Sequence, residues 1–493
     1  MSKADLNNYI GGEWTCSGTQ GYCDVENPST GQAVARVPLS SPEEAEQAVA
    51  AAKAAFPEWS ATPVSRRCDF LFKLTDLLRG KAEELARLIS EENGKSLPDS
   101  RAEVKRALEN AEVACGMPLH QQGDKLINGA AGIDGEVLRL PVGVFGMIAP
   151  FNFPLMVPFW FFPYALATGN TYVIKPSEQA PCSMQRVAEM IEECGFPPGV
   201  FNLVHGDRVA AERLLEHRDV QGISFVGTSR VCRTVAVRSA ETNKRCQALG
   251  SAKNHLVVMP DAKIDPVIRN MISSCYGCAG QRCMASSAII CVGDEVCQTV
   301  TDAFLKASRG VRVASPLDPE VASESMLMGP VISAKAKRFI LDMIQVGVDE
   351  GATLALDGRG LEVEGCQGGH FIGPTVFTDV KPGMKIHQTE IFGPVVVILK
   401  VATLDEAIQV INDHQYGNGA SIYTQNGHYA REFKLRTRVG MVGVNVGIPA
   451  PVASLPFGGM KDSIFADVKA QGKAVVQFFT EPKVITERYW PED

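Results

Sequence analysis

Cys283 is the residue whose surroundings most suggest covalent chemistry. It follows Arg282 in the segment 280–283, between a run of small residues, 277–280, and an apolar stretch that begins at Ser287. A thiol beside a cation and near a chain turn can be partly ionised and exposed, as a nucleophile must be. Most cysteines in a chain that has 14 of them are small buried hydrophobes. The local sequence therefore leaves both interpretations open.

A second cysteine pattern, Cys275-x-x-Cys278, could indicate a metal site. Structural zinc needs four ligands, and no second pair or suitably spaced histidine lies nearby in the sequence. We therefore predict no metal. The other cysteines are scattered through a long chain, and residues 1–14 show neither a secretory leader nor a transit peptide. Reduced thiols and a cytoplasmic location are the expectation.

The elements that would position Cys283 alternate between strand and helix. In the first half of the chain, β-branched runs predict strands at 143–148, 171–174, 200–204 and 222–226, with helices at 183–193 and 207–217. The second series predicts strands at 256–259, 287–292, 395–400 and 419–423, with helices at 294–306 and 334–350. Helical periodicity also marks 41–56, 65–93 and 99–115. This alternation predicts an α/β protein with two doubly wound α/β domains.

Composition excludes several classes of protein. The 493 residues are 45% hydrophobic, enough for two or three domains, and the net charge of −8 opposes binding to nucleic acid or acidic membranes. Residues 141–174 carry no charge and could span a bilayer by length. Recurrent prolines, with Asn152 and Asn170, argue instead for a buried strand, a loop and the start of a helix. No membrane partner is expected.

Five short motifs, in order and spacing, resemble the aldehyde dehydrogenase superfamily: 150–154, 174–178, 225–228, 280–283 and 390–394. The resemblance runs from 9–14 to 456–459, essentially the whole chain. It implies an aldehyde dehydrogenase-like fold with three parts. These are an NAD-binding domain (1–122 and 141–249), a catalytic domain (250–468) and a small β oligomerisation extension (123–140 and 469–493). In the family the extension pairs with a neighbouring subunit, which predicts a homodimer or homotetramer.

The resemblance assigns nucleophilic catalysis to Cys283, which would attack an aldehyde carbonyl and, after hydride transfer, carry a thioester. The oxyanion would be held by the Asn152 side-chain amide and the Cys283 N–H. Removing one such donor usually lowers the rate by a factor of about 100 to 1,000. A turn residue between prolines is the alternative interpretation of Asn152.

The resemblance also implies NAD as the cofactor. Lys175 and Glu178 follow a predicted strand end, where dinucleotides bind in open parallel sheets, and would hold the adenosine ribose. Glu178 would repel a 2′-phosphate, which favours NAD over NADP. The other implied contacts are Gln179 beside this pair, Thr228 at a helix start near the pyrophosphate, Glu390 at the nicotinamide ribose, Phe392 near the nicotinamide, and Ala149, Phe151 and Gly250 through backbone or shape. The alternative interpretation of Lys175 and Glu178 is a solvated loop pair, and that of Phe392 is a core aromatic residue. Cys232 replaces a glycine that is common in the family, near the expected pyrophosphate site.

The subtype depends on a missing residue. Hydrolytic members use a glutamate to activate water, but this chain has Ala248 and Leu249 where that carboxylate would stand. A thioester sheltered from activated water persists until a thiol such as coenzyme A arrives. Segments 252–255, 257–262 and 280–285 resemble the CoA-acylating methylmalonate-semialdehyde dehydrogenase subgroup. That resemblance implies oxidation of malonate or methylmalonate semialdehyde, loss of CO2, and formation of acetyl-CoA or propionyl-CoA.

A small-molecule semialdehyde that carries a carboxylate needs a cation in its pocket. Arg282 and Arg106, on the predicted helix 99–115, match arginines that the subgroup uses there, and a charge-assisted hydrogen bond is worth roughly 1.5 to 3 kcal/mol. The alternative for Arg106 is an exposed arginine paired with Glu103 or Glu109. Segment 455–461 and Ala466 depart from the subgroup near the expected substrate mouth. Two other functions stay open: a non-acylating, hydrolytic semialdehyde dehydrogenase, and a catalytically inactive structural or binding protein on the same fold.

Overall fold

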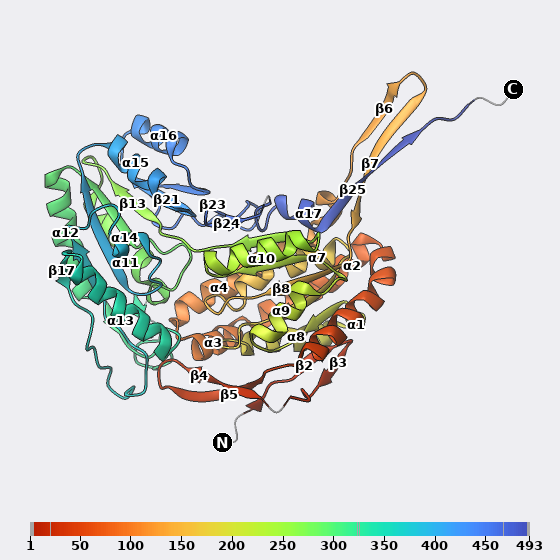
Figure 1. The fold of residues 1–493 in the computed structure, drawn as a ribbon, viewed down its shortest axis with the longest axis horizontal. Helices are drawn as coiled ribbons and strands as arrows, with labels where there is room; N and C mark the ends of the chain where they lie inside the picture. Colours follow the sequence, from red (N-terminus) through yellow and green to blue (C-terminus); the bar gives the residue numbers. More distant parts are fainter. Residues whose placement is uncertain (1–3, 20, 323, 325, 467, 491–493) are drawn as a thin grey trace.

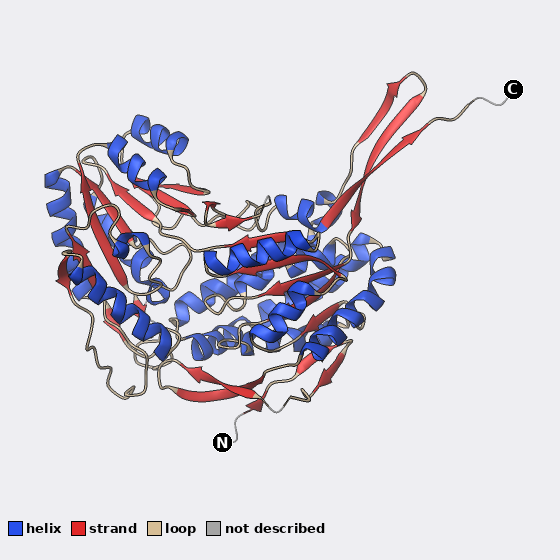
Figure 2. Ribbon diagram, viewed as in Figure 1, coloured by secondary structure: helices blue, strands red, loops and turns tan. Residues whose placement is uncertain are grey.

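The computed structural model describes residues 4–19, 21–322, 324, 326–466 and 468–490, and is built around two large sheets flanked by helices (Figures 1 and 2). The first sheet has eight strands, and its members from β12 to β10 run parallel. In spatial order they are β24 (Ile464–Phe465), β12 (Arg245–Leu249), β11 (Val220–Val226), β8 (Val144–Ile148), β9 (Thr171–Lys175), β10 (Phe201–Leu203), β2 (Asn8–Ile10) and β3 (Glu13–Thr15).

The second sheet has seven strands, all parallel except β17 at one edge. In spatial order they are β17 (Thr353–Leu356), β18 (Thr375–Thr378), β19 (Val395–Val401), β14 (Ala288–Val292), β13 (His255–Val258), β21 (Gly419–Tyr423) and β22 (Met441–Val444). The two parallel sheets confirm the prediction of two doubly wound α/β units. The sequence-based boundaries of the domains stay a prediction.

Helices cover both faces of the first sheet (Figure 2). On one face lie α1 (Pro42–Ala61), α9 (Arg208–Glu216) and α10 (Ser229–Glu241), and on the other α2 (Val64–Gly80), α3 (Ala82–Asn93), α4 (Leu97–Cys115), α5 (Met117–His120), α6 (Met156–Phe159), α7 (Phe162–Ala167) and α8 (Cys182–Cys194). Later in the chain come α11 (Ile264–Tyr276), α12 (Asp294–Arg309), α13 (Ala334–Asp349), α14 (Lys385–Gln388), α15 (Leu404–Asp413), α16 (Gly427–Arg436) and α17 (Ala474–Phe479). Buried apolar side chains form a separate main cluster around each sheet.

Local sequence signals predict the start of the first N-terminal helix and the helical character of the residues that follow it. The Ser41 hydroxyl accepts from the Glu44 N–H while the Glu44 carboxylate accepts from the Ser41 N–H, a capping box that starts α1. The helical periodicity over 65–93 corresponds to two helices rather than one. The chain forms α2 and α3 there, separated at Lys81, whose φ of −112° and ψ of 19° are not helical.

The uncharged segment 141–174 is part of the protein interior. It supplies β8, a loop, α6, α7 and most of β9, as the sequence predicts, and nearly all of its side chains are buried. Of the helices formed by the described residues, none is both long enough and apolar enough to cross a membrane.

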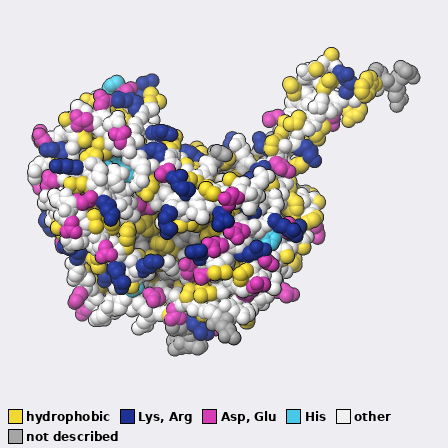
Figure 3. All heavy atoms as spheres, viewed as in Figure 1, with side chains coloured by type: hydrophobic (Ala, Val, Ile, Leu, Met, Phe, Trp, Pro, Cys, Tyr) yellow, Lys and Arg dark blue, Asp and Glu magenta, His cyan; other side chains and the backbone are white. Residues whose placement is uncertain are grey.

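A three-stranded arm projects from the body of the molecule (Figures 1 and 3). It consists of β6 (Lys125–Ala130), β7 (Ile133–Pro141) and β25 (Thr480–Glu487), in the order β25-β7-β6 and antiparallel. Leu126, Ile127 and Val484 are exposed along it. Two smaller N-terminal strands, β4 (Tyr22–Asn27) and β5 (Gln32–Pro38), pair with each other, and β1 (Ala4–Asp5) joins β5.

Candidate active site

Most of the predicted cofactor residues lie at the carboxyl ends of the parallel strands of the first sheet. The N–H of Ala149, after β8, donates to the carbonyl of Lys175 at the end of β9 (2.9 Å). Gly227 follows β11 and Gly250 follows β12. Strands β8 and β11 are neighbours in the sheet. The chain continues from β8 to β9 on one side of this pair and from β11 to β12 on the other side. Such a reversal of strand order creates the crevice in which open parallel sheets bind dinucleotides.

Lys175 and Glu178 form an ion pair at 2.9 Å beside this crevice. The lysine is buried and also donates to the Gly206 carbonyl at 2.6 Å, whereas the Glu178 side chain is 38% exposed. Gln179 is half-buried, and its N–H donates to the Ser177 hydroxyl. A carboxylate that is oriented by a lysine and open to solvent can accept hydrogen bonds from ribose hydroxyl groups.

The first turn of α10 offers a place for an anion. Thr228 is the N-cap of this helix, is exposed, and makes no capping bond through its side chain. Gly250 allows the chain to pass close to that turn, because a Cβ there would collide with the Ser229 hydroxyl. Cys232 is fully buried, with its thiol directed to the Gly227 carbonyl at 3.8 Å. The cysteine that replaces a family glycine therefore does not block the helix N-terminus, where N–H groups attract anions.

Cys283 follows a tight turn between α11 and β14. Cys278 and Ala279 in this turn have φ values of 51° and 52°, which L-residues rarely adopt. The Cys283 carbonyl accepts hydrogen bonds from the side-chain amides of Asn254, at 2.8 Å, and Asn418, at 2.9 Å. The backbone of the nucleophile is therefore held on both sides.

Cys283 lines a cavity of about 320 Å³ whose walls come from both α/β units. Polar side chains on one face of α4 form one wall, and apolar side chains from α6, the segment after it, and 448–457 form the rest. Its lining includes Asp99, Glu103, Arg106, Phe153, Trp160, Arg282, Ile448 and Phe457. A small organic substrate fits a space of this size and mixed polarity.

The Cys283 thiol is not ionised by its neighbours in the free protein. Burial raises its pKa to about 12, and the Glu390 carboxylate acts in the same direction. The Arg282 charge lowers the pKa only weakly. In the free protein the effect of burial therefore outweighs that of the adjacent cation on the thiol pKa.

The Asn152 side chain lies beside the segment that carries Cys283. It is buried, and Nδ2 donates to the carbonyl of Gln281, two residues before Cys283, at 3.1 Å. The structure therefore brings this amide next to the segment that carries the thiol.

Glu390 and Phe392 belong to one loop before β19, and Phe392 contacts Phe151. The Glu390 carboxylate accepts from the Ala252 N–H at 2.9 Å, and burial raises its pKa to about 7. Phe392 has a φ of 57°, a strained value for a bulky residue. Its ring meets that of Phe151 edge to face, with centroids 5.9 Å apart. Phe151 and Phe392, which are far apart in the sequence, thus lie in contact.

The two predicted substrate arginines both line the cavity, but each already has a carboxylate partner. Arg282 donates from Nη2 to Asp99 at 2.5 Å and from Nε to the Cys278 sulfur at 3.2 Å. Arg106 pairs with Glu109 at 2.6 Å and is 41% exposed. Arg106 therefore both lines the cavity and forms the exposed ion pair with Glu109 that was its alternative interpretation.

Sequence reasoning missed the polar groups that support these residues. Asp99, Glu103 and Arg106 recur at helical spacing on α4, and the first two hold other parts of the site. Glu103 forms an ion pair with Lys95. The helical spacing of these charged residues could have indicated that they share one face of α4, although it does not identify their partners.

The Cys275–Cys278 pair engages other groups. The Cys275 thiol donates to the Ser286 carbonyl at 2.8 Å, while Cys278 accepts from Arg282. Among the described residues, no cluster of three or more His, Cys, Asp or Glu has a geometry suited to a metal ion.

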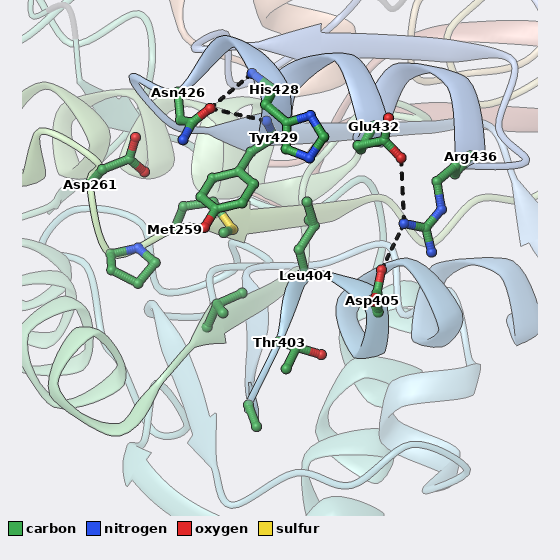
Figure 4. Close-up of a pocket in the computed structure, with 13 residues that line it drawn as sticks. Met259, Asp261, Thr403, Leu404, Asp405, Asn426, His428, Tyr429, Glu432 and Arg436 are labelled. Carbon is green, nitrogen blue, oxygen red and sulfur yellow. Dashed lines mark hydrogen bonds and ion pairs between the residues drawn. The ribbon is translucent and has the colours of Figure 1, made fainter.

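A larger hollow of about 710 Å³ lies at the carboxyl end of the second sheet (Figure 4). Arg436 pairs there with Asp405 at 2.7 Å and with Glu432 at 3.7 Å, and the Asn426 side chain caps α16. Asp261 accepts from the Gln425 N–H. No residue that the sequence predicts for the site lines this hollow, so the smaller cavity beside Cys283 is the candidate active site.

Comparisons with known proteins identify relatives over nearly the whole length of the chain. The model of the aldehyde dehydrogenase family matches residues 14–485. The chain is 44% identical over 484 residues to malonate-semialdehyde dehydrogenase 1 of Geobacillus kaustophilus (strain HTA426), covering 98% of each chain. It is also 44% identical to malonate-semialdehyde dehydrogenase of Bacillus pumilus (strain SAFR-032), covering 99% of this chain and 100% of that one.

Solved structures show the same fold. Methylmalonate-semialdehyde dehydrogenase from Oceanimonas doudoroffii superposes with a TM-score of 0.96 at 39% identity and covers 99% of each chain. An NAD complex from Sinorhizobium meliloti 1021, provisionally assigned as methylmalonate-semialdehyde dehydrogenase, has a TM-score of 0.97 at 39% identity and covers 100% of this chain and 99% of that one. With a family match over nearly its whole length, this chain belongs to the aldehyde dehydrogenase family.

Proposed function

We propose that this chain is an NAD-dependent, CoA-acylating dehydrogenase of malonate semialdehyde or methylmalonate semialdehyde. The observation that carries the proposal is the cavity of about 320 Å³, which is lined by Cys283 and by two guanidinium groups, those of Arg282 and Arg106. A nucleophile close to two cations suits an aldehyde that carries a carboxylate. The names of the relatives above support the same substrate class.

The crevice at the end of the first sheet fits NAD. Its residues include a helix N-terminus with an exposed N-cap, at Thr228, and a half-exposed carboxylate, Glu178. Lys175 and Glu178 would hold the adenosine ribose, and Glu390 the nicotinamide ribose. NAD, when bound there, accepts the hydride that the aldehyde carbon releases. The NAD complex of a relative at 39% identity supports this assignment.

The side chains of the cavity account for the oxidation. Cys283, once deprotonated, adds through sulfur to the aldehyde carbon, and the negative oxygen receives hydrogen bonds from Asn152 Nδ2 and the Cys283 N–H. Departure of hydride restores the carbonyl and leaves a thioester on Cys283. Arg282 and Arg106 hold the substrate carboxylate during this step.

Decarboxylation and acyl transfer complete the reaction. The thioester carbonyl accepts the electron pair of the bond to the carboxylate, CO2 leaves, and the resulting enolate takes up a proton. The thiol of coenzyme A then attacks the acyl carbon, which releases the Cys283 thiol and acetyl-CoA or propionyl-CoA. Water lacks an activating carboxylate at the end of β12, because the side chain there is the buried Leu249.

The molecular context is also a proposal. The free edges and exposed apolar side chains of the β6-β7-β25 arm support a homodimer or homotetramer. All 14 cysteines are free thiols, which supports a reducing compartment such as the cytoplasm.

The test is the formation of NADH and acyl-CoA from both semialdehydes with NAD, in the presence and absence of coenzyme A. We expect turnover to require coenzyme A and to yield acetyl-CoA or propionyl-CoA. NADH that accumulates freely without coenzyme A would show a hydrolytic enzyme instead. Absence of NADH with a panel of aldehydes would favour an inactive protein on the same fold.

The hydrolytic alternative has one observation in its favour. Burial raises the pKa of Glu390, whose charge acts on the Cys283 thiol, to about 7, so this carboxylate could accept a proton from water. If CoA-independent turnover is found and Glu390→Gln abolishes it at saturating NAD, the alternative function is the correct one.

A further inference from the structure

The loop that carries Asn152 depends on distant side chains for its shape. Residues 149–155 form neither helix nor strand, yet most of them are buried. Buried backbone groups without a helical or sheet partner must be satisfied by other groups. The position of the Asn152 amide is therefore set by whatever binds the backbone of this loop.

Three side chains from α3, α4 and the link between them bind that backbone. The Asn93 amide donates to the Phe151 carbonyl at 2.9 Å, and Lys95 Nζ donates to the Asn152 carbonyl at 2.5 Å. Glu103 Oε1 accepts from the N–H groups of Leu155, at 2.9 Å, and Met156, at 3.1 Å. The loop is thus held before, at and after the catalytic amide.

Lys95 and Glu103 also form an ion pair with each other at 2.5 Å, and both side chains are 0% exposed. The ammonium group additionally lies 4.1 Å from the centre of the Phe153 ring. A buried ion pair of this kind is poor evidence for a gain in stability, since desolvation offsets the attraction. Its geometry, with one partner on the carbonyl of Asn152 and the other on the N–H groups that follow, is suited to orienting the loop.

We propose that Lys95 and Glu103 are positioning residues that hold the Asn152 amide in line with the carbonyl oxygen of the aldehyde. This proposal rests on the proposed function, in which Asn152 is the oxyanion donor. Neither side chain touches the reacting atoms. Their contribution passes through one backbone carbonyl and two N–H groups. A displacement of a catalytic group by 1 Å can lower a rate by about 100-fold.

A double-mutant cycle tests the proposal. We compare Lys95→Met, Asn152→Ala and the double variant in single-turnover formation of NADH from malonate semialdehyde, at saturating NAD. The matched control is Arg101→Met, which removes an exposed cation on α4 that pairs with Glu83. Alkylation of Cys283 by iodoacetamide at the wild-type rate verifies that the nucleophile itself is undisturbed.

The expected pattern is non-additive. Asn152→Ala should slow the reaction by about 100- to 1,000-fold, and Lys95→Met by about 100-fold. The double variant should lie within about twofold of Asn152→Ala, because misplacing an amide that is absent changes nothing further. Arg101→Met should keep the wild-type rate.

Other outcomes would contradict the positioning role alone or the positioning role together with the oxyanion role. If the two losses multiply, or if Lys95→Met keeps its rate while Asn152→Ala does not, the positioning role is wrong and the proposed function stands. If Asn152→Ala keeps its rate, the oxyanion role and the positioning role fall together. Should Lys95→Met not fold with Glu103 unpaired, the cycle is run with Lys95→Met/Glu103→Gln, which leaves no buried charge and keeps an oxygen for the N–H groups of Leu155 and Met156.

Discussion

Asp99 on helix α4 accepts a hydrogen bond from Nη2 of Arg282 at 2.5 Å, so the arginine beside the nucleophile is already paired when substrate arrives. Although burial acts to raise it, the charge of Arg282 and the Cys278 N–H hold the pKa of Asp99 below its usual value. A Cβ at Gly277 would collide with the guanidinium group. The position of the Arg282 guanidinium group is therefore fixed by its ion pair with Asp99 and by its close contact with Gly277.

Removing Arg282 should harm substrates that carry a carboxylate more than a neutral aldehyde. Arg282→Leu/Asp99→Asn removes both charges and leaves no unpaired carboxylate near the thiol. Loss of a charge-assisted hydrogen bond, worth about 1.5 to 3 kcal/mol, should lower kcat/KM for malonate semialdehyde by roughly 10- to 100-fold relative to propanal. Steady-state kinetics with both aldehydes measure this ratio. Equal losses on the two would exclude Arg282 from carboxylate binding.

Glu109 competes with substrate for Arg106, because the two side chains form an ion pair at 2.6 Å while Arg106 lines the cavity. Glu109→Gln should lower KM for malonate semialdehyde by about twofold, the small change expected for a part-exposed pair, and Arg106→Leu should raise it. Propanal should respond to neither variant. An increase of KM in Glu109→Gln would show that the pair orients Arg106 rather than occupying it.

Alkylation kinetics should reveal the protonated state of the nucleophile. With a pKa raised by burial to about 12, Cys283 should react slowly with iodoacetamide at pH 7.5, and faster with each unit of rising pH. Cys297 is the internal comparison, since its hydrogen bond with Cys291 lowers its pKa to about 7. Peptide mass spectrometry should find Cys297 modified first.

Glu390→Gln removes a negative charge that raises the thiol pKa. Alkylation of Cys283 in this variant should therefore be faster than in the wild type at the same pH. An unchanged rate would mean that the carboxylate does not act on the thiol.

A carboxylate at position 249 should create a hydrolytic route. Leu249 is 4% exposed at the end of β12, so a glutamate there would be desolvated, with a raised pKa suited to a general base. Leu249→Glu should form NADH without coenzyme A, whereas Leu249→Gln, of the same size, should not. Equal CoA dependence in both variants would show that the missing base is not decisive.

Three buried histidines should make the protein sensitive to acid. The rings of His255, His387 and His414 have centroids 5.1 to 5.3 Å apart, and burial, with the neighbouring charges, lowers the pKa of His387 to about 3 and of His414 to about 4. The unfolded chain binds these protons near pH 6.5 and the folded chain does not, so stability is complete above pH 6.5 and falls as the pH decreases below it.

At pH 5 each such histidine should lower the free energy of unfolding by about 2 kcal/mol. Denaturant unfolding of the wild type and of His414→Gln at pH 7.5 and pH 5 measures the difference. The variant should lose less stability between the two pH values. Identical losses would place the acid-sensitive groups elsewhere.

Four strands of each sheet could be predicted because their signal is local. The expected strand 143–148 is β8 at Val144–Ile148, and 287–292 is β14 at Ala288–Val292, since both are continuous apolar runs of a buried parallel sheet. β12 was not predicted, because Arg245 and Gln247 interrupt its apolar pattern and its two neighbours in the sheet stabilise it instead.

Motifs predict which residues belong to the candidate site, but they do not predict the electrostatic partners of those residues. Arg282 and Asp99 are 183 residues apart in the chain, and only the packing of α4 against the segment before Cys283 brings them together. The same packing desolvates the thiol, which reverses the effect expected from an adjacent cation. A pKa depends on burial in three dimensions, and sequence spacing carries little of that information.

Helix α4 also limits how this enzyme can change. Asp99 pairs with the arginine next to the thiol, Glu103 binds the loop that carries Asn152, and Arg106 lines the cavity, all from this one helix. A substitution that tilts or slides this helix would alter substrate choice and catalytic rate together. Variants selected for a new acyl group should therefore accumulate in the 448–457 wall, where the cavity can be reshaped without moving the catalytic groups.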